Sequence, residues 1–102
     1  MRLIAKEVQM DAEDMKSVSF QLRKENNLAM VLGAKAGGKA LLSVMLTDDL
    51  VAKGLNANAM IREIAKDIQG SGGGQPFFAT AGGVSPEGMP SALAKAKEII
   101  EQ

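Results

Sequence analysis

Two clusters of glycine bracket one short apolar segment near the carboxyl end of this chain, and they constrain its fold more than any other feature. Six of the 11 glycines lie between Gly70 and Gly83. An ordered glycine costs conformational entropy, so such a cluster indicates positive φ angles or a surface that something approaches closely. A flexible linker is the alternative, but linkers are usually padded with polar residues. These glycines run directly into the apolar segment 76–79, typical of a buried strand, so we expect a loop held against that strand.

The glycines form neither of the familiar nucleotide-binding motifs. A P-loop ends in Gly-Lys-Ser/Thr, whereas Gly74 is followed by Gln75 and Pro76. The dinucleotide fingerprint needs its third glycine where Gln75 stands, and it lies between a strand and a following helix. Here a helical pattern precedes the glycines and a strand follows them. The sequence therefore argues against both kinds of nucleotide site.

The order of residues around the glycines does resemble the hallmark of the DHH-associated domain, the globular C-terminal domain of alanyl-tRNA synthetases. That family repeats a run of glycines, a polar residue, a proline, a short apolar stretch and then Ala-x-Ala-Gly-Gly. The matching residues here are Gly72-Gly73-Gly74-Gln75-Pro76 and Ala79-Thr80-Ala81-Gly82-Gly83. Two positions depart from the pattern, since many members carry a basic residue in place of Gln75 and Gln in place of Thr80. Each departure removes a polar contact that other members could make to RNA.

The resemblance implies a non-catalytic module that contacts the elbow of an alanine-specific tRNA and helps present it to aminoacylation and editing sites elsewhere. The side-chain-free backbone of Gly72, Gly73 and Gly74, together with the adjoining Gln75, could lie against bases or ribose. A turn at Gly82 and Gly83 could offer amides to a phosphate. The resemblance also implies a larger synthetase of which this chain is an excised C-terminal fragment, with Met1 native or added. That parent would use ATP with Mg²⁺ and a zinc site in its other domains, and it could form a homodimer.

Two other functions stay open. The same accessory domain occurs in DHH-type phosphoesterases, where it helps to hold nucleotide or single-stranded nucleic acid beside a metal site. Those enzymes typically place a histidine directly after the glycine run, at the position of Gln75, and this chain has no histidine. The other possibility is a dimerisation domain, in which the glycines serve only close backbone contact.

The amino-acid composition excludes several kinds of catalytic and metal-binding site. With no cysteine and no histidine there is no disulfide, thiol nucleophile or histidine base, and no zinc site of the usual kinds, so we expect no cofactor in the fragment itself. Asp48 and Asp49 form an adjacent acidic pair, and their place at the start of a short helix favours capping over metal binding. No stretch of about 18 apolar residues indicates a membrane span, so we expect a soluble, cytoplasmic protein without membrane contact.

The charges also limit how strongly the chain could bind nucleic acid. Twelve basic and 12 acidic residues give a formal net charge of zero, which argues against strong autonomous binding by phosphate neutralisation. Lys35 and Lys39 lie near the tip of a predicted hairpin. Lysines there commonly keep a strand end soluble, and the functional alternative is a pair of phosphate contacts.

The pattern of apolar residues predicts one α/β (α+β) domain over residues 1–102, with a small mixed sheet of about four strands packed by helices. The expected order is β-α-β-β-α-β-α. Glycines 37 and 38 should form a two-residue hairpin turn, and Asp11 should cap the first helix. The expected elements are a strand at 3–8, a helix from Asp11 to about Asn26, strands at 28–32 and 41–46, a helix at 56–68, a strand at 76–79 and a helix from about Pro90 nearly to Gln102.

Overall fold

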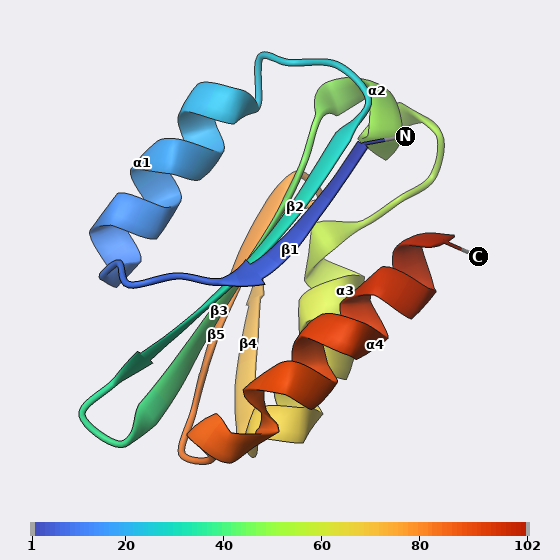
Figure 1. Cartoon of the computed structure of the whole chain (residues 1–102). Coiled ribbons are helices and arrows are strands. Elements are labelled where there is room, and N and C mark those ends of the chain that lie inside the picture. The colour runs from blue at the N-terminus through green and yellow to red at the C-terminus, as the bar shows by residue number, and fades with distance from the viewer. Residues whose placement is uncertain (1, 102) are drawn as a thin grey trace.

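The computed structural model describes residues 2–101 and contains a five-stranded sheet with helices on both faces (Figure 1). The strands lie in the order β1-β2-β3-β5-β4; β1 and β2 are parallel, and every other neighbouring pair is antiparallel. This confirms the predicted α/β class and mixed sheet, with one strand more than expected. The elements, in which η marks a 3-10 helix, are β1 (Arg2–Glu7), α1 (Ala12–Leu22), β2 (Leu28–Ala36), β3 (Lys39–Leu46), α2 (Asp48–Ala52), α3 (Ala57–Ile64), η1 (Ala65–Ile68), β4 (Gly70–Gly74), β5 (Phe78–Gly83), η2 (Pro86–Gly88) and α4 (Met89–Glu101).

Local chemistry explains where several of these elements begin. The Asp11 side chain accepts a hydrogen bond of 2.8 Å from the Asp14 N–H and caps α1 as predicted. Asn56 caps α3 in the same way. Gly37 and Gly38 have φ angles of +57° and +78°, so they form the predicted two-residue turn between β2 and β3. These boundaries can be predicted from residues that are close together in the sequence.

Several boundaries differ from the prediction: the strand expected at 76–79 is β5 at Phe78–Gly83, the other strands shift or extend by a few residues, and three differences concern helices. Helix α1 ends at Leu22 rather than near Asn26, and the chain turns through residues 23–27, where Asn27 takes a left-handed φ of +58°, before β2 begins. The helix expected over 56–68 tightens into η1 after Ile64 and stops at Gln69, which also has a positive φ. One turn of 3-10 helix, η2, precedes α4, which starts at Met89.

The predicted glycine loop is wrong, because residues 70–74 form strand β4. They pair with β5 in antiparallel register, from Gly70 opposite Gly83 to Gly74 opposite Ala79. The predicted turn at Gly82 and Gly83 is wrong for the same reason. Both residues end β5 and lie between β3 and β4, so their amides belong to the sheet and do not form a free anion site.

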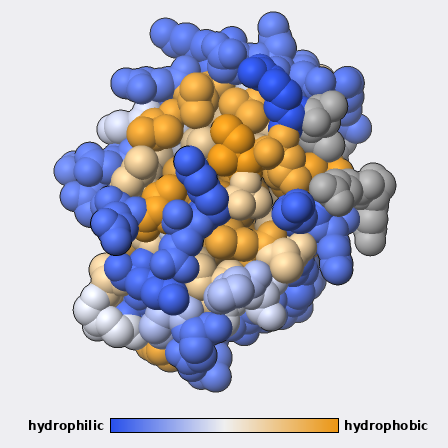
Figure 2. All heavy atoms as spheres, in the orientation of Figure 1, coloured by the Kyte–Doolittle hydropathy of each residue, from blue (hydrophilic) through white to orange (hydrophobic). Residues whose placement is uncertain are grey.

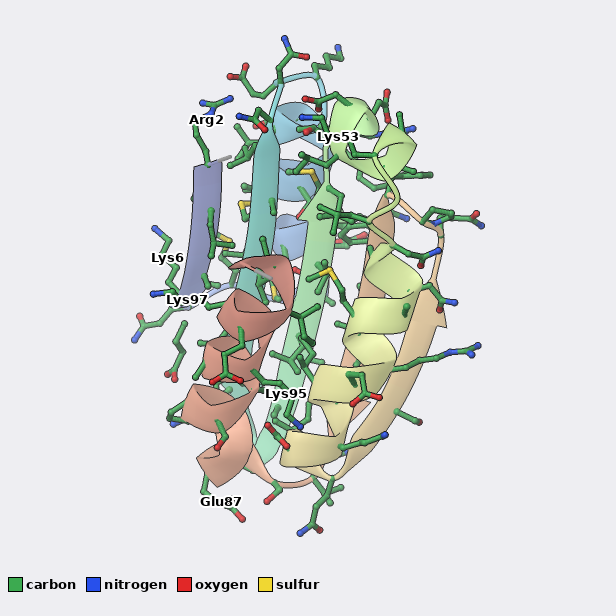
Figure 3. The ribbon with its side chains drawn as sticks, turned by 90° about the vertical axis from the view of Figure 1, so that its right-hand side faces the viewer. Arg2, Lys6, Lys53, Glu87, Lys95 and Lys97 are labelled. Atoms are coloured by element: carbon green, nitrogen blue, oxygen red, sulfur yellow. The ribbon has the colours of Figure 1, made fainter. Side chains whose placement is uncertain are left out.

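The two faces of the sheet are covered unequally. Helices α3, η1 and α4 pack against one face around a large aliphatic core, and Lys95 of α4 reaches across to Asp67 of η1 with an N–O distance of 2.9 Å (Figure 3). Only α1 covers the other face, over a smaller core that contains Met15, Met30 and Met45. Seen from the β1 edge, apolar side chains gather between these layers and hydrophilic ones surround them (Figure 2). Over residues 2–101, no helix is both long and apolar enough to span a membrane.

Candidate nucleic-acid interface

Helix α1 leaves part of its own face of the sheet open. On that face β2 and β3 contribute buried side chains such as Leu32 and Met45. Farther along the same face, Thr80 and Gly82 of β5 and Ser71 of β4 are exposed. The half of the sheet formed by β5 and β4 is therefore accessible to a ligand on the α1 side, whereas its opposite side is covered by α3.

A groove of about 400 Å³ occupies this open region, which we call the sheet groove. Its floor includes Ser43, Thr80 and Gly73, which lie side by side on three neighbouring strands. Ala12 and Met15 of α1 form one wall. The Ser43 hydroxyl is buried and is the one such side-chain polar atom in the described residues without a hydrogen-bond partner. The groove is thus partly polar along its floor and carries no side chain at its glycines.

Two further hollows continue the sheet groove along the strands. The first shares Gly73 and Thr80 with it and adds Gln75, Phe20 and Lys16, beside the turn between β4 and β5. The second shares Ser71 and Gly82 with it and adds Gly83 and Lys39 at the opposite end. Together they form one depression along β4 and β5 with a lysine at each end.

The glycines of β4 have two different structural roles. A Cβ atom at Gly70, Gly72 or Gly74 would lie between 2.1 and 2.5 Å from a backbone carbonyl oxygen of β5, so these alternate positions exclude any side chain. At Gly73 the nearest heavy atom to a Cβ would be Asn58 Oδ1, at 3.0 Å, and at Gly82 it would be a Leu41 methyl carbon at 3.9 Å. The sheet therefore requires glycine at 70, 72 and 74, whereas Gly82 has space for a side chain.

The outer edge of β4 is only partly protected. Gln75 and Phe78 exchange backbone hydrogen bonds of 2.8 and 3.3 Å. This pair determines which residues of β4 point their N–H groups toward β5 and which point them away. By alternation, the N–H groups of Gly70, Gly72 and Gly74 point away from β5. The Gly74 N–H donates to Asn58 Oδ1 of α3 at 3.1 Å. Near Gly70 and Gly72 the strand offers backbone donors on residues that carry no side chain, with Ser71 between them.

The structure brings most of the predicted site residues to this depression and separates one from it. Gly72, Gly73 and Gly82 line the sheet groove, and Gly74 and Gln75 line the hollow beside the turn. Gly83 and Lys39 line the hollow at the other end. Lys35 lies in none of these hollows, and its ammonium is 3.7 Å from a carboxylate oxygen of Glu7.

A cationic and aromatic cluster was not predicted from the sequence. Phe20 and Arg23 of the α1 segment lie against Phe77 and Phe78 at the turn end of the depression. The spacing of Lys16, Phe20 and Lys24 at i, i+4 and i+8 could have indicated one shared face of a helix. That face is distinct from the apolar one of Met15, Val18 and Leu22, which packs on the sheet.

The acidic pair lies in the first turn of α2, as expected, but Thr47 is the N-cap and no side-chain hydrogen bond caps this helix, so the predicted capping role is wrong. Both Asp49 carboxylate oxygens accept from the Asn27 N–H, and one accepts from the Thr47 hydroxyl at 2.6 Å. The Thr47 hydrogen bond, helped by that from Asn27, lowers the pKa of Asp49 below its ordinary value. Asp48 accepts from Arg23 at 3.2 Å. Both carboxylates are thereby engaged with groups of this chain.

Comparison with known proteins places this architecture in a family. The DHHA1 domain model matches residues 1–102. The chain is 49% identical over 100 residues to an alanine–tRNA ligase of Christiangramia forsetii, covering 96% of this chain and 12% of the ligase. It is 51% identical over 90 residues to the ligase of Bacteroides thetaiotaomicron, with 86% and 10% covered. The chain therefore spans about a tenth of the length of these relatives.

A solved structure shows the same fold. The C-Ala domain from Aquifex aeolicus alanyl-tRNA synthetase superposes with a TM-score of 0.85 and 24% sequence identity, over 99% of this chain and 90% of that domain. The resemblance inferred from the glycine motif is thus confirmed by the sequence and by the fold. This chain belongs to the DHHA1 domain family.

Proposed function

We propose that this domain is the C-terminal tRNA-binding module of an alanine–tRNA ligase. It contacts the elbow of the tRNA and helps to present one tRNA to the aminoacylation and editing sites of the same enzyme. The named relatives are alanine–tRNA ligases, which supports the assignment of the parent protein. In this proposal the other domains of that parent are partners, they hold the ATP, Mg²⁺ and zinc, and the enzyme acts in the cytoplasm.

The depression along β4 and β5 is the observation that carries the proposal. RNA is recognised largely through ribose hydroxyls, phosphates and unstacked bases, all of which need close access to backbone and polar groups. Gly73 and Gly82 give such access, because no side chain stands on the groove at these positions. Thr80 supplies an exposed hydroxyl between them. The lysines at the two ends, Lys16 and Lys39, are placed to meet phosphates.

The charge balance sets the expected strength of this contact. The chain has zero formal net charge, and Lys39, Lys16 and Lys24 are the exposed cations closest to the depression. About two to four phosphate contacts give a slope of roughly −1.4 to −2.8 in log affinity against log salt for single-stranded RNA. Binding by the isolated domain is therefore weak and mildly salt-dependent, as suits a module that assists a larger enzyme.

The phosphoesterase alternative receives less support. Gln75 stands where those enzymes typically place the histidine that follows the glycine run, and it lines a hollow with Phe20 and Thr80. Self-association remains a second candidate, because the open β4 edge near Gly70 and Gly72 could pair with another strand.

The test fills the sheet groove without disturbing the fold. Gly82→Val places a β-branched side chain on the exposed face of β5, where the nearest neighbour of its Cβ is 3.9 Å away. We expect about tenfold weaker binding to alanine tRNA, or ~1.4 kcal/mol, with melting preserved. Lys53→Ala, at an exposed cation outside the depression, is the matched control.

A minihelix that lacks the elbow separates elbow recognition from general RNA binding. The proposal predicts markedly tighter binding of full tRNA than of the minihelix. Equal affinity for the two RNAs rejects elbow recognition, and unchanged tRNA affinity in Gly82→Val rejects the sheet groove as the site.

A further inference from the structure

All three phenylalanines of this chain meet at one surface, although the chain has no other aromatic residue. The Phe20 ring contacts Phe78 edge-on with centroids 5.2 Å apart, and it lies 6.2 Å from Phe77 at a tilt of 54°. Phe20 is 41% exposed. The larger core of the molecule contains none of these rings and is aliphatic instead. The aromatic side chains are thus concentrated where the depression ends, beside the turn between β4 and β5.

Cations surround these rings. The Arg23 guanidinium lies 3.5 Å from the centroid of Phe77, and the Lys16 ammonium lies 5.5 Å from the centroid of Phe20. Lys24 borders the same surface with Phe20. Two carboxylates also border it, Asp48, which holds Arg23, and Glu13. Arg23 is therefore fixed by its partner, whereas Lys16 has no ion-pair partner among the described residues and is able to meet an anion.

The turn that presents these rings is held on both sides. The Pro76 carbonyl accepts a hydrogen bond of 2.8 Å from the Ala57 N–H at the start of α3, and Asn58 binds the neighbouring Gly74. On the opposite side, Arg23 stacks on Phe77. A binding surface that is ordered before its ligand arrives loses less conformational entropy on binding. This surface is therefore prepared for contact.

The combination of groups selects the ligand class. An exposed ring favours a flat partner, and stacking between a base and an aromatic side chain contributes substantially to single-strand binding. The neighbouring lysine favours a phosphate beside that flat group. The exposed Gln75 amide, which both donates and accepts, borders the same hollow of about 430 Å³ and can meet the polar edge of a base. A nucleotide carries all three features.

We propose that the hollow between α1 and the β4–β5 turn receives one unstacked RNA base on the ring of Phe20, with its phosphate at Lys16 and its edge at Gln75. This inference rests on the proposed function, because it names the part of the RNA that the turn end of the depression takes. It assigns base contact to this end and leaves backbone contact to the glycine floor.

The test uses a short single-stranded RNA with one 2-aminopurine, whose fluorescence falls when the base stacks. Phe20→Leu keeps an apolar side chain and removes the aromatic face, and Phe20→Tyr keeps that face. We expect Phe20→Leu to bind about 5- to 10-fold more weakly and to lose the fluorescence quenching, which corresponds to the lower end of measured stacking contributions. Phe20→Tyr should stay within about twofold of the unaltered chain. Melting of each variant checks that the fold persists.

Two control ligands separate this inference from the proposed function. An abasic RNA of the same length should bind the unaltered chain and Phe20→Leu equally. If Phe20→Leu keeps both affinity and quenching, the inference is overturned, while a loss of tRNA binding in Gly82→Val would still support the proposed function. If the oligonucleotide stacks on Phe20 but full tRNA does not bind, the inference stands and the proposed function fails. If no RNA binds, both the inference and the proposed function are overturned. That result would favour a protein segment as the partner that packs on the exposed Phe20 ring.

Discussion

Alanine at Gly72 and alanine at Gly82 should have opposite effects on stability, although both glycines line the same groove. A Cβ at Gly72 would lie 2.1 Å from the Thr80 carbonyl oxygen and 2.5 Å from the Ala81 Cα. Ordinary van der Waals contact begins near 3.4 Å. Because the obstacle is backbone of a central strand, β4 must move by about 1 Å or more to admit one methyl group.

The magnitude follows from the cost of overpacking. Forcing an extra methyl group into a packed site typically costs 1–3 kcal/mol, so Gly72→Ala should lower the free energy of unfolding by about 2 kcal/mol. At roughly 4–8 °C per kcal/mol for a domain of this size, the melting temperature should fall by about 8–16 °C. Gly82 has no positive φ and has free space, so Gly82→Ala should raise stability by about 0.4–1 kcal/mol.

Circular dichroism during thermal and urea unfolding measures both effects, since the chain has no tryptophan for fluorescence. Gly73→Ala is the intermediate case, because its Cβ meets only the Asn58 side-chain oxygen at 3.0 Å. We expect the order of melting temperatures to be Gly82→Ala above Gly73→Ala above Gly72→Ala. Equal melting of the Gly72 and Gly82 variants would refute the assignment of Gly72 to close strand contact.

Three other predictions concern charge and the strand edge. Because the pKa of Asp49 is lowered in the folded chain, this carboxylate stabilises the fold above its ordinary pKa of 3.8, and the stabilisation is lost as the pH falls through the lower folded-state pKa. Asp49→Asn should therefore flatten the loss of stability below about pH 4 in acid unfolding curves. An acid unfolding curve of the same slope as that of the unaltered chain would contradict this. Lys39→Ala should reduce the slope of log affinity for tRNA against log salt by about 0.7–0.9. Lys35 is paired with Glu7, so Lys35→Ala should leave that slope unchanged. Equal effects of the two variants, in titrations at several salt concentrations, would show that both lysines contact phosphates. Asn58→Ala removes the acceptor of the Gly74 N–H and should speed hydrogen exchange at that amide, with the amides of β3 as the internal reference; unaltered exchange at Gly74 would argue against this edge protection.

Short-range chemistry explains which parts of the fold the sequence could predict. The Asp11 cap and the Gly37–Gly38 turn depend on residues within a few positions of each other, and the structure confirms both. The amphipathic face of 57–68 also predicted its helix, although the final turn tightens into η1. These features need no knowledge of distant partners.

Strand β4 could not be predicted in the same way, because glycine has low β propensity and the strand exists only through its pairing with β5. The alternation of Gly70, Gly72 and Gly74 did contain a usable signal, since alternate residues of a strand point to the same face. The insertion of β5 between β3 and β4 is a long-range property of the sheet. This strand order creates the sheet groove. The sequence therefore indicated several residues of the candidate site, but not the surface on which they lie together.

The cationic and aromatic cluster illustrates the same limit. Phe20, Phe77 and Arg23 are brought together by the packing of α1 beside the β4–β5 turn, and more than 50 residues of sequence separate Phe20 from Phe77. The helical spacing of Lys16 and Phe20 places them on one face of α1. Only the folded arrangement shows that this face adjoins Gln75 and the end of the depression.

Amide chemical shifts of the labelled domain during titration with alanine tRNA give the sharpest test of RNA binding at the sheet groove, because they report which face of the sheet the RNA contacts. We expect shifts or broadening at Gly73, Thr80, Gly82 and Phe20, with the amides of α4 unaffected. We also expect a minihelix without the elbow to produce much smaller changes at the same concentration. Perturbations confined to α3 and α4, or equal perturbations by both RNAs, would contradict tRNA elbow binding at this groove.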